Sequence, residues 1–150
     1  MDWRPYLAKG LVKAHRPDRR QIERQLLRAD KDLKTLGLVI RQDPEWAATM
    51  AYQSMLRLGR ALMFSRGYLP ADGQQHKTVV EATGKLLGRG SEVLVNRFDR
   101  MRRSRNVFFY DSLDAHDQAH ARAGLDAALK LSAAIKALLR EDGPQGDLPV

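Results

Sequence analysis

The sequence contains no cysteine, which excludes disulfide bonds and any chemistry that needs a thiolate. It also lacks runs of alternating β-branched residues, so it gives no sign of half-buried strands. No apolar run approaches the roughly 20 residues of a membrane-spanning helix, and the N-terminal residues lack the apolar segment of a signal peptide. These absences predict a soluble, cytoplasmic, helical protein with no membrane partner.

Acidic residues are outnumbered by basic ones, 18 against 26, which gives a formal net charge of +8. This excess favours a polyanionic partner, with nucleic acid first and an acidic protein second. Net charge alone does not fix the partner, because many basic proteins bind no anion. The 150 residues, of which 43% are hydrophobic, suffice for one globular domain with its own core.

Apolar residues recur at helical spacing along most of the chain, which predicts an all-α, up-and-down bundle of four to five helices. Asp43 is a good N-terminal cap with Pro44 at the first helical position, and Gly67 is a natural C-terminal cap. Asp111 or Asp114 is expected to cap the last helix. The expected helices cover residues 18–42, 44–66, 75–88, 91–110 and a final stretch that ends near 140.

The bundle is expected to occupy residues 18–140, between a basic N-terminal segment (1–17) and a disordered tail (141–150). Its second helix is apolar on most sides and rich in alanine and other small residues. A helix of this composition is expected at the centre of a bundle, with neighbours packed closely on several faces.

An arginine cluster precedes the last helix, and its final member, Arg105, lies on an apolar stripe. The residues that share this helical face are Leu94, Phe98, Met101, Arg105 and Phe108. An arginine there must reach water, pair with an acid or meet an anion, because an unpaired buried charge is costly. Its partner is therefore either a bound anion or a nearby acid such as Glu81 or Asp99. The remaining arginines of the cluster are Arg97, Arg100, Arg102 and Arg103.

Two segments carry motifs that occur together in one family: AYQSMLRLGRALMFSRGYLP followed by HKTVVE, and RSRNVFFYD. The first looks like the second helix, glycine turn and third helix of HEPN domains, which are prokaryote-enriched helical bundles. The second resembles their late motif, in which an arginine and an asparagine are followed by a histidine. The resemblance covers roughly residues 51–111 and implies the same helical fold.

HEPN proteins are largely homodimers, and their arginine and histidine motifs meet in a groove between two subunits. Arg105 and Asn106 match the first half of this motif, while the histidine position holds Tyr110, followed by Asp111. The resemblance therefore implies that Arg105, Asn106 and Tyr110 are the candidate catalytic residues. Tyrosine has a reference pKa of about 10 and is a poor base near neutral pH, so binding is better supported than catalysis. Tyr110 could equally be a core or rim aromatic whose hydroxyl finds a partner.

RNA is the expected ligand, since several HEPN proteins are metal-independent ribonucleases that act as toxins or defence effectors. The candidate RNA contacts are Arg102, Arg103, Arg105 and His76, the last of which is expected to be exposed or near a helix start. We therefore predict RNA binding by a homodimer of a toxin–antitoxin or defence system, with any enzymatic activity being that of a metal-independent endoribonuclease. The alternative is a non-catalytic module that docks onto an acidic partner such as a nucleotidyltransferase or antitoxin.

His116 and His120 have the four-residue spacing of a helical zinc pair and loosely resemble a metalloprotease motif. No convincing third ligand follows, and those enzymes need a sheet, so a polar helix start is the preferred interpretation. No metal or other cofactor is expected. Whether His76, His116 or His120 supplies the base that the motif lacks stays open.

Overall fold

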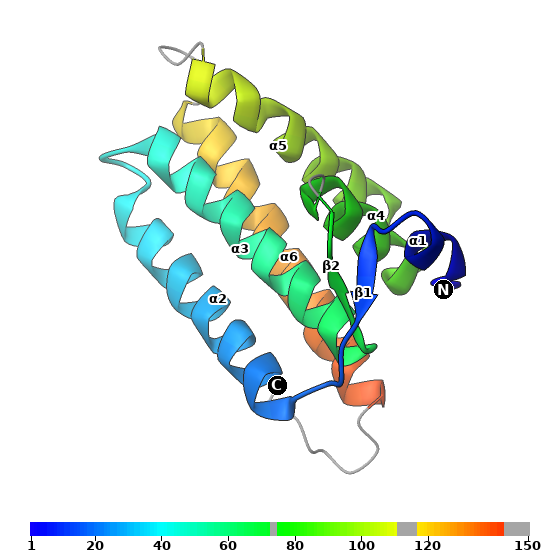
Figure 1. Ribbon diagram of the computed structural model, residues 1–150. Helices are drawn as coiled ribbons and strands as arrows, with labels where there is room; N and C mark the ends of the chain where they lie inside the picture. The colour runs from blue at the N-terminus through cyan, green and yellow to red at the C-terminus, as the bar shows by residue number, and fades with distance from the viewer. Residues whose placement is uncertain (73–74, 111–116, 143–150) are drawn as a thin grey trace.

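The computed structural model describes the backbone of residues 1–72, 75–110 and 117–142, and their side chains except those of residues 105–110 and 142. The chain folds into a helical bundle with one small two-stranded sheet (Figure 1). The predicted all-α bundle is thus confirmed. Its elements in chain order are α1 (Arg4–Ala8), β1 (Val12–Ala14), α2 (Arg19–Val39), α3 (Pro44–Ser65), β2 (Tyr68–Pro70), α4 (Gln75–Leu87), α5 (Glu92–Tyr110) and α6 (Gln118–Asp142).

Helix α3 forms the centre of the bundle, as its small and apolar residues predict. It contacts α2, α4, α5 and α6, and Figure 1 shows it running between α2 and α6. Because neighbours cover it on several sides, most of its residues are buried, including Ala51, Met55 and Leu62. This helix supplies the core surface against which the functional candidates on α4 and α5 are positioned.

Aspartates cap the N-termini of three long helices. A carboxylate at this position accepts hydrogen bonds from backbone amides of the first turn that have no partner within the helix. The Asp18 carboxylate accepts from the backbone amides of the next residues of α2, and Asp43 accepts from the Trp46 amide at 3.0 Å. The cap of α6 is Asp117, which accepts from the His120 amide at 2.8 Å. The prediction of Asp111 or Asp114 was wrong, because α6 begins only at Gln118.

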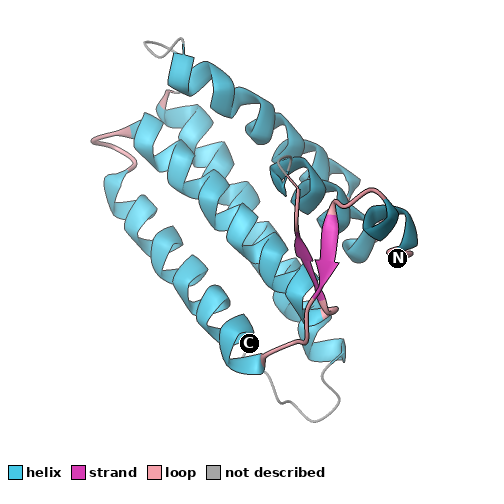
Figure 2. Ribbon diagram, viewed as in Figure 1, coloured by secondary structure: helices cyan, strands magenta, loops and turns pink. Residues whose placement is uncertain are grey.

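Residues before α2 form two elements that the sequence did not predict, α1 and β1. Strand β1 pairs antiparallel with β2, with Val12 opposite Pro70 (Figure 2). Trp3 stacks on Tyr68 of β2 with 4.3 Å between ring centroids, and Tyr6 is buried. The sequence contains no sign of these strands, because three-residue strands are too short to show alternation and form here through tertiary contacts.

Two glycines allow helices to approach closely around α4. A Cβ at Gly59 would lie 2.6 Å from both Val79 and Thr83 side-chain atoms, and one at Gly84 would lie 2.9 Å from Val95. The α3–α4 and α4–α5 contacts therefore depend on the absence of a side chain at Gly59 and at Gly84.

Within the described part of the chain, no helix is both long and apolar enough to cross a lipid bilayer.

Candidate functional site

The apolar stripe of α5 packs into the bundle over its first half, as predicted. Phe98 is fully buried, and Leu94 is partly buried against the core. Met101 packs against α6 close to α3, since a Cβ added to Gly124 of α6 would be 3.4 Å from the Met101 terminal carbon and 3.5 Å from Ala51 of α3. This face of α5 is therefore fixed against the interior immediately before the motif begins.

The arginine–asparagine motif lies in the last turns of α5, whose backbone continues to Tyr110. With a rise of about 1.5 Å per residue, the backbone of Arg105 lies about 6 Å beyond Met101 on nearly the same face. The side chains of Arg105, Asn106 and Tyr110 lie outside the described part of the structure. Their roles as catalytic candidates therefore stay predictions.

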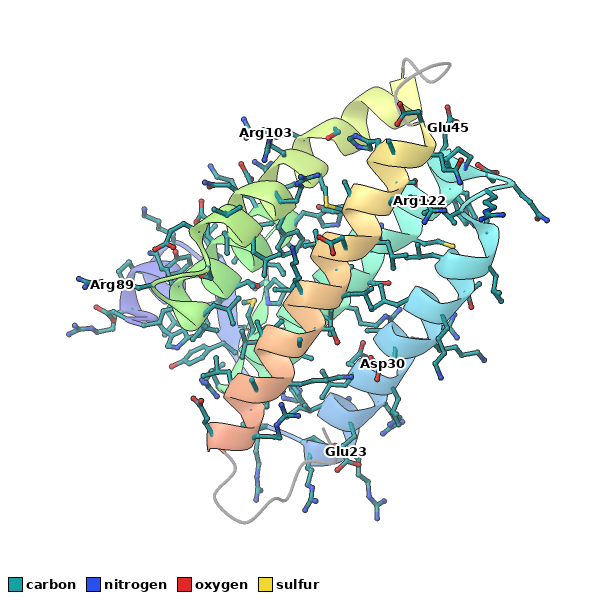
Figure 3. All side chains as sticks on the ribbon, turned by 180° about the vertical axis from the view of Figure 1, so that it is seen from behind. Glu23, Asp30, Glu45, Arg89, Arg103 and Arg122 are labelled. Carbon is teal, nitrogen blue, oxygen red and sulfur yellow. The ribbon has the colours of Figure 1, made fainter. Side chains whose placement is uncertain are left out.

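Asp99 is the acid to which two of the candidate RNA contacts are paired. Its carboxylate oxygens lie 2.8 Å from Nε of Arg102 and 3.2 Å from Nε of Arg103. Figure 3 shows Arg103 on the outer side of α5, where its side chain is 63% exposed, against 26% for Arg102. Arg105 is six residues from Asp99, so the two are not neighbours on one helix, which disfavours this acid as its partner. The other proposed acid, Glu81, is exposed on α4.

His76 is brought to the motif-bearing face of α5 through Tyr52. The Tyr52 hydroxyl lies 3.0 Å from Nδ1 of His76, and the Tyr52 ring meets Phe98 edge-on at 6.1 Å. Phe98 precedes Arg105 by two turns on the same face of α5. His76 lies in the first turn of α4, near the helix start as expected, and its side chain is half-buried.

Sequence reasoning missed Tyr52 because a buried tyrosine on an apolar helix resembles a core residue. Its position opposite the start of α4 brings the hydroxyl within hydrogen-bond distance of His76. The available signal was the phenolic group itself, which needs a hydrogen bond when buried. Tyr52 is 3% exposed, and its hydroxyl has that bond.

Of the two histidines considered as a zinc pair, only His120 lies in the described part of the chain. There, no group of three or more histidine, cysteine or acidic side chains could hold a metal ion. His120 is exposed in the first turn of α6, while His116 lies outside the described residues. His120 therefore lies in the polar helix start that was the preferred interpretation of the HDQAH segment.

Comparison with known proteins identifies the fold family. A model of the HEPN domain matches residues 22–138, which span α2 to α6 and include both motif segments. No significant match was found among curated proteins or among solved structures. Since the matched range is most of the chain, this protein belongs to the HEPN domain family.

Proposed function

We propose that this HEPN protein binds RNA with the C-terminal half of α5, as a homodimer in a prokaryotic toxin–antitoxin or defence system. At the family level, a HEPN domain indicates a nuclease, RNA-related or nucleotidyltransferase-associated role. The observation that carries the proposal is the charge of α5 between residues 97 and 105, where five arginines accompany one aspartate. That aspartate, Asp99, pairs with Arg102 and Arg103, so the segment keeps a clear excess of positive charge.

The arginines suit phosphate recognition because a guanidinium presents a planar fork of donors that matches phosphate oxygens. Asp99 holds the Arg102 side chain at 2.8 Å, which reduces the conformational entropy that RNA binding would cost. In this proposal Arg105 and Asn106 contact the RNA backbone in the dimer groove, with Arg102 and Arg103 beside them. Tyr110 binds a phosphate by hydrogen bonding or stacks on a base.

Binding is proposed as the main activity because the motif lacks its histidine. Metal-independent RNA cleavage needs a base for the 2′-hydroxyl proton, and a tyrosine with a pKa of about 10 is poorly suited to that step. Two described histidines lie near α5: His76 contacts Tyr52, whose ring meets Phe98, and His120 precedes by one turn the α6 glycine that meets Met101. Any endoribonuclease activity would therefore need another base, for which His76, His116 and His120 are the candidates.

The test compares RNA binding by wild-type protein, Arg105→Ala and Arg100→Ala at low and high salt. Arg100 is exposed on the same helix, five residues before Arg105 and about 140° away around the helix axis, so its variant removes the same charge from another face. Binding is expected to weaken with salt and to fall about tenfold or more in Arg105→Ala, with a smaller loss in Arg100→Ala. Equal losses in the two variants, or no binding by wild type, would contradict the proposal.

A second candidate function is docking onto an acidic protein, which the outer face of α2 favours. Lys31 and Lys34 are exposed there beside two leucines, Leu27 and Leu38, which are 63% and 81% exposed. Exposed apolar residues within a basic face suit an acidic partner such as an antitoxin or nucleotidyltransferase. Co-expression with the product of a neighbouring gene tests this. Lys31→Glu with Lys34→Glu should abolish the complex, and an intact complex would refute the docking site.

A further inference from the structure

Helices α3, α5 and α6 meet at one level of the bundle, one turn before the arginine–asparagine motif. A Cβ added to Gly124 of α6 would lie 3.4 Å from the terminal carbon of Met101 on α5 and 3.5 Å from the Cβ of Ala51 on α3. Gly124 is itself buried. These three residues therefore mark a level at which contacts define how the three helices are aligned.

One turn further toward the end of the bundle, α5 carries Arg105 and α6 carries His120. The two helices run in opposite directions, since α6 begins at the end of the molecule where α5 stops (Figure 1). Arg105 follows Met101 by four residues and His120 precedes Gly124 by four, so each backbone position lies about 6 Å beyond the contact. The two positions consequently share a level, on helices that contact each other.

His120 also lies on the side of α6 that is turned away from α2. Lys136 marks the α2 side, because its Nζ lies 2.8 Å from the Asp30 carboxylate of α2. His120 precedes Lys136 by 16 residues, which corresponds to about 160° around the helix axis. Figure 3 shows α6 between α2 and α5, so the side opposite α2 is the one toward α5. The His120 side chain is exposed there, where a ligand bound to α5 can reach it.

The other histidine near α5, His76, lies at a different level. Its hydrogen-bond partner Tyr52 meets Phe98 edge-on. Phe98 precedes Arg105 by seven residues, or about 10 Å along the axis of α5. Of these two histidines, His120 is therefore the one whose level matches that of the motif.

We propose that His120 is part of the RNA site on α5 and binds the same phosphate group as Arg105. This inference rests on the proposed function and adds to it a contact from a second helix. An imidazole N–H can donate to one phosphate oxygen while a guanidinium donates to the others. The His120 backbone amide donates to the Asp117 carboxylate at 2.8 Å, which fixes the first turn of α6 before RNA binds. A turn that is already ordered lowers the entropy cost of binding.

The test measures the RNA affinity of full-length wild-type protein, His120→Ala and His15→Ala. His15 is the matched control, an exposed histidine whose ring lies 5.0 Å from that of Phe64, near the opposite end of α3. Affinity is expected to fall about tenfold in His120→Ala, because a hydrogen bond to a charged group is lost, and to change less than about twofold in His15→Ala. Unchanged affinity in His120→Ala, or an equal loss in His15→Ala, would overturn the inference.

A double-mutant cycle tests whether the two side chains share one phosphate group. If they do, adding His120→Ala to Arg105→Ala should weaken RNA binding much less than His120→Ala does in the wild-type protein. Losses that simply multiply would contradict a shared contact. The imidazole NMR signals of His120 in the isotope-labelled wild-type protein should also shift saturably with RNA. Signals that stay unchanged would overturn the inference without any variant.

The same measurements separate this inference from the proposed function. If Arg105→Ala weakens RNA binding and His120→Ala does not, the inference is wrong and the α5 proposal is supported. If wild-type protein binds no RNA, the proposed function is wrong and the inference fails with it. Thermal unfolding of His120→Ala verifies that the variant is folded before its affinity is compared.

Discussion

Neighbouring arginines on one helix have different environments in this protein, because each residue advances about 100° around the helix axis. Arg102 is mostly covered and is held by Asp99, whereas Arg103 shares that acid but is largely exposed. Covered, pre-positioned guanidiniums lose less freedom when they bind phosphate than exposed ones do. At the scale of single residues, the helix face and the nearest acid therefore determine how much a given arginine can contribute to phosphate binding.

The hydroxyl of Tyr52 is predicted to stabilise the fold through His76. Tyr52→Phe removes one hydrogen bond at a buried position, and we expect the free energy of unfolding to fall by about 1 kcal/mol. Urea denaturation monitored by circular dichroism measures this change. Tyr68→Phe is the matched control, since it deletes the same atom from a half-buried ring. Similar losses in both variants would show that the His76 contact adds no stability.

The side chain of His76 could not be assigned from sequence because its surroundings come from other elements. A histidine near a helix start is usually exposed, and nothing in the neighbouring residues indicates a buried tyrosine partner. Tyr52 precedes it by 24 positions, so the contact exists only once α3 and α4 pack together. By contrast, the burial of Phe98 and Met101 follows from helical spacing alone.

Close packing of α4 against its neighbours is the main feature at the scale of elements. At Gly59 the side-chain atoms of α4 occupy the space that a Cβ would need, and Gly84 makes the equivalent approach to α5. The start of α4, which carries Gln75 and His76, is thereby held against α3. The position of His76 consequently depends on the close approach of α4 to α3 that Gly59 allows.

Gly59→Ala is predicted to destabilise the protein by about 1–3 kcal/mol, because the new methyl group would overlap Val79 and Thr83 at 2.6 Å. Gly37→Ala is the control, since a Cβ at that exposed position of α2 meets nothing within 4 Å. That substitution should stabilise the helix by about 0.5–1 kcal/mol through reduced backbone entropy. Chemical denaturation of both variants measures the difference. A neutral Gly59→Ala would mean that α4 can move away without cost.

Helix boundaries were largely predictable from the sequence. Asp43 and Pro44 start α3 where expected, and α2, α4 and α5 begin and end within a few residues of their predicted limits. Local signals are sufficient there, because capping and apolar spacing act within one or two turns. The start of α6 differed from its prediction. Several aspartates precede this helix, and only the folded backbone shows that Asp117 is its N-terminal cap.

The N-terminal residues join the bundle at the scale of the whole molecule. Residues 1–17 were expected to precede the bundle, but α1 and β1 fall within them and contact the rest of the protein. Tyr6 and Val12 are buried, and Trp3 stacks on Tyr68. The Lys85 ammonium group of α4 lies 4.8 Å from the centre of the Tyr6 ring. These contacts link the first residues to β2 and α4.

Removal of residues 1–17 is therefore predicted to lower the free energy of unfolding by about 3 kcal/mol or more. Burial of a large side chain contributes about 1.5–3 kcal/mol, and this truncation loses at least Tyr6 and Val12. Urea midpoints of the full-length and truncated proteins measure the effect. Leu7→Ala, at a side chain that is 41% exposed, should change stability far less. An unchanged midpoint after truncation would show that α1 and β1 are energetically dispensable.

The sequence by itself determined the class of this protein, its long helices, its central helix and its membership of the HEPN family. Those features depend on local spacing and on motifs that are continuous along the chain. Tertiary structure alone decided the β1–β2 pairing, the Tyr52–His76 contact and the hydrogen bonds of Arg57 to α2 and of Arg60 to α4. The physical reason is that each of these depends on residues from separate elements, whose proximity is created only when the helices pack.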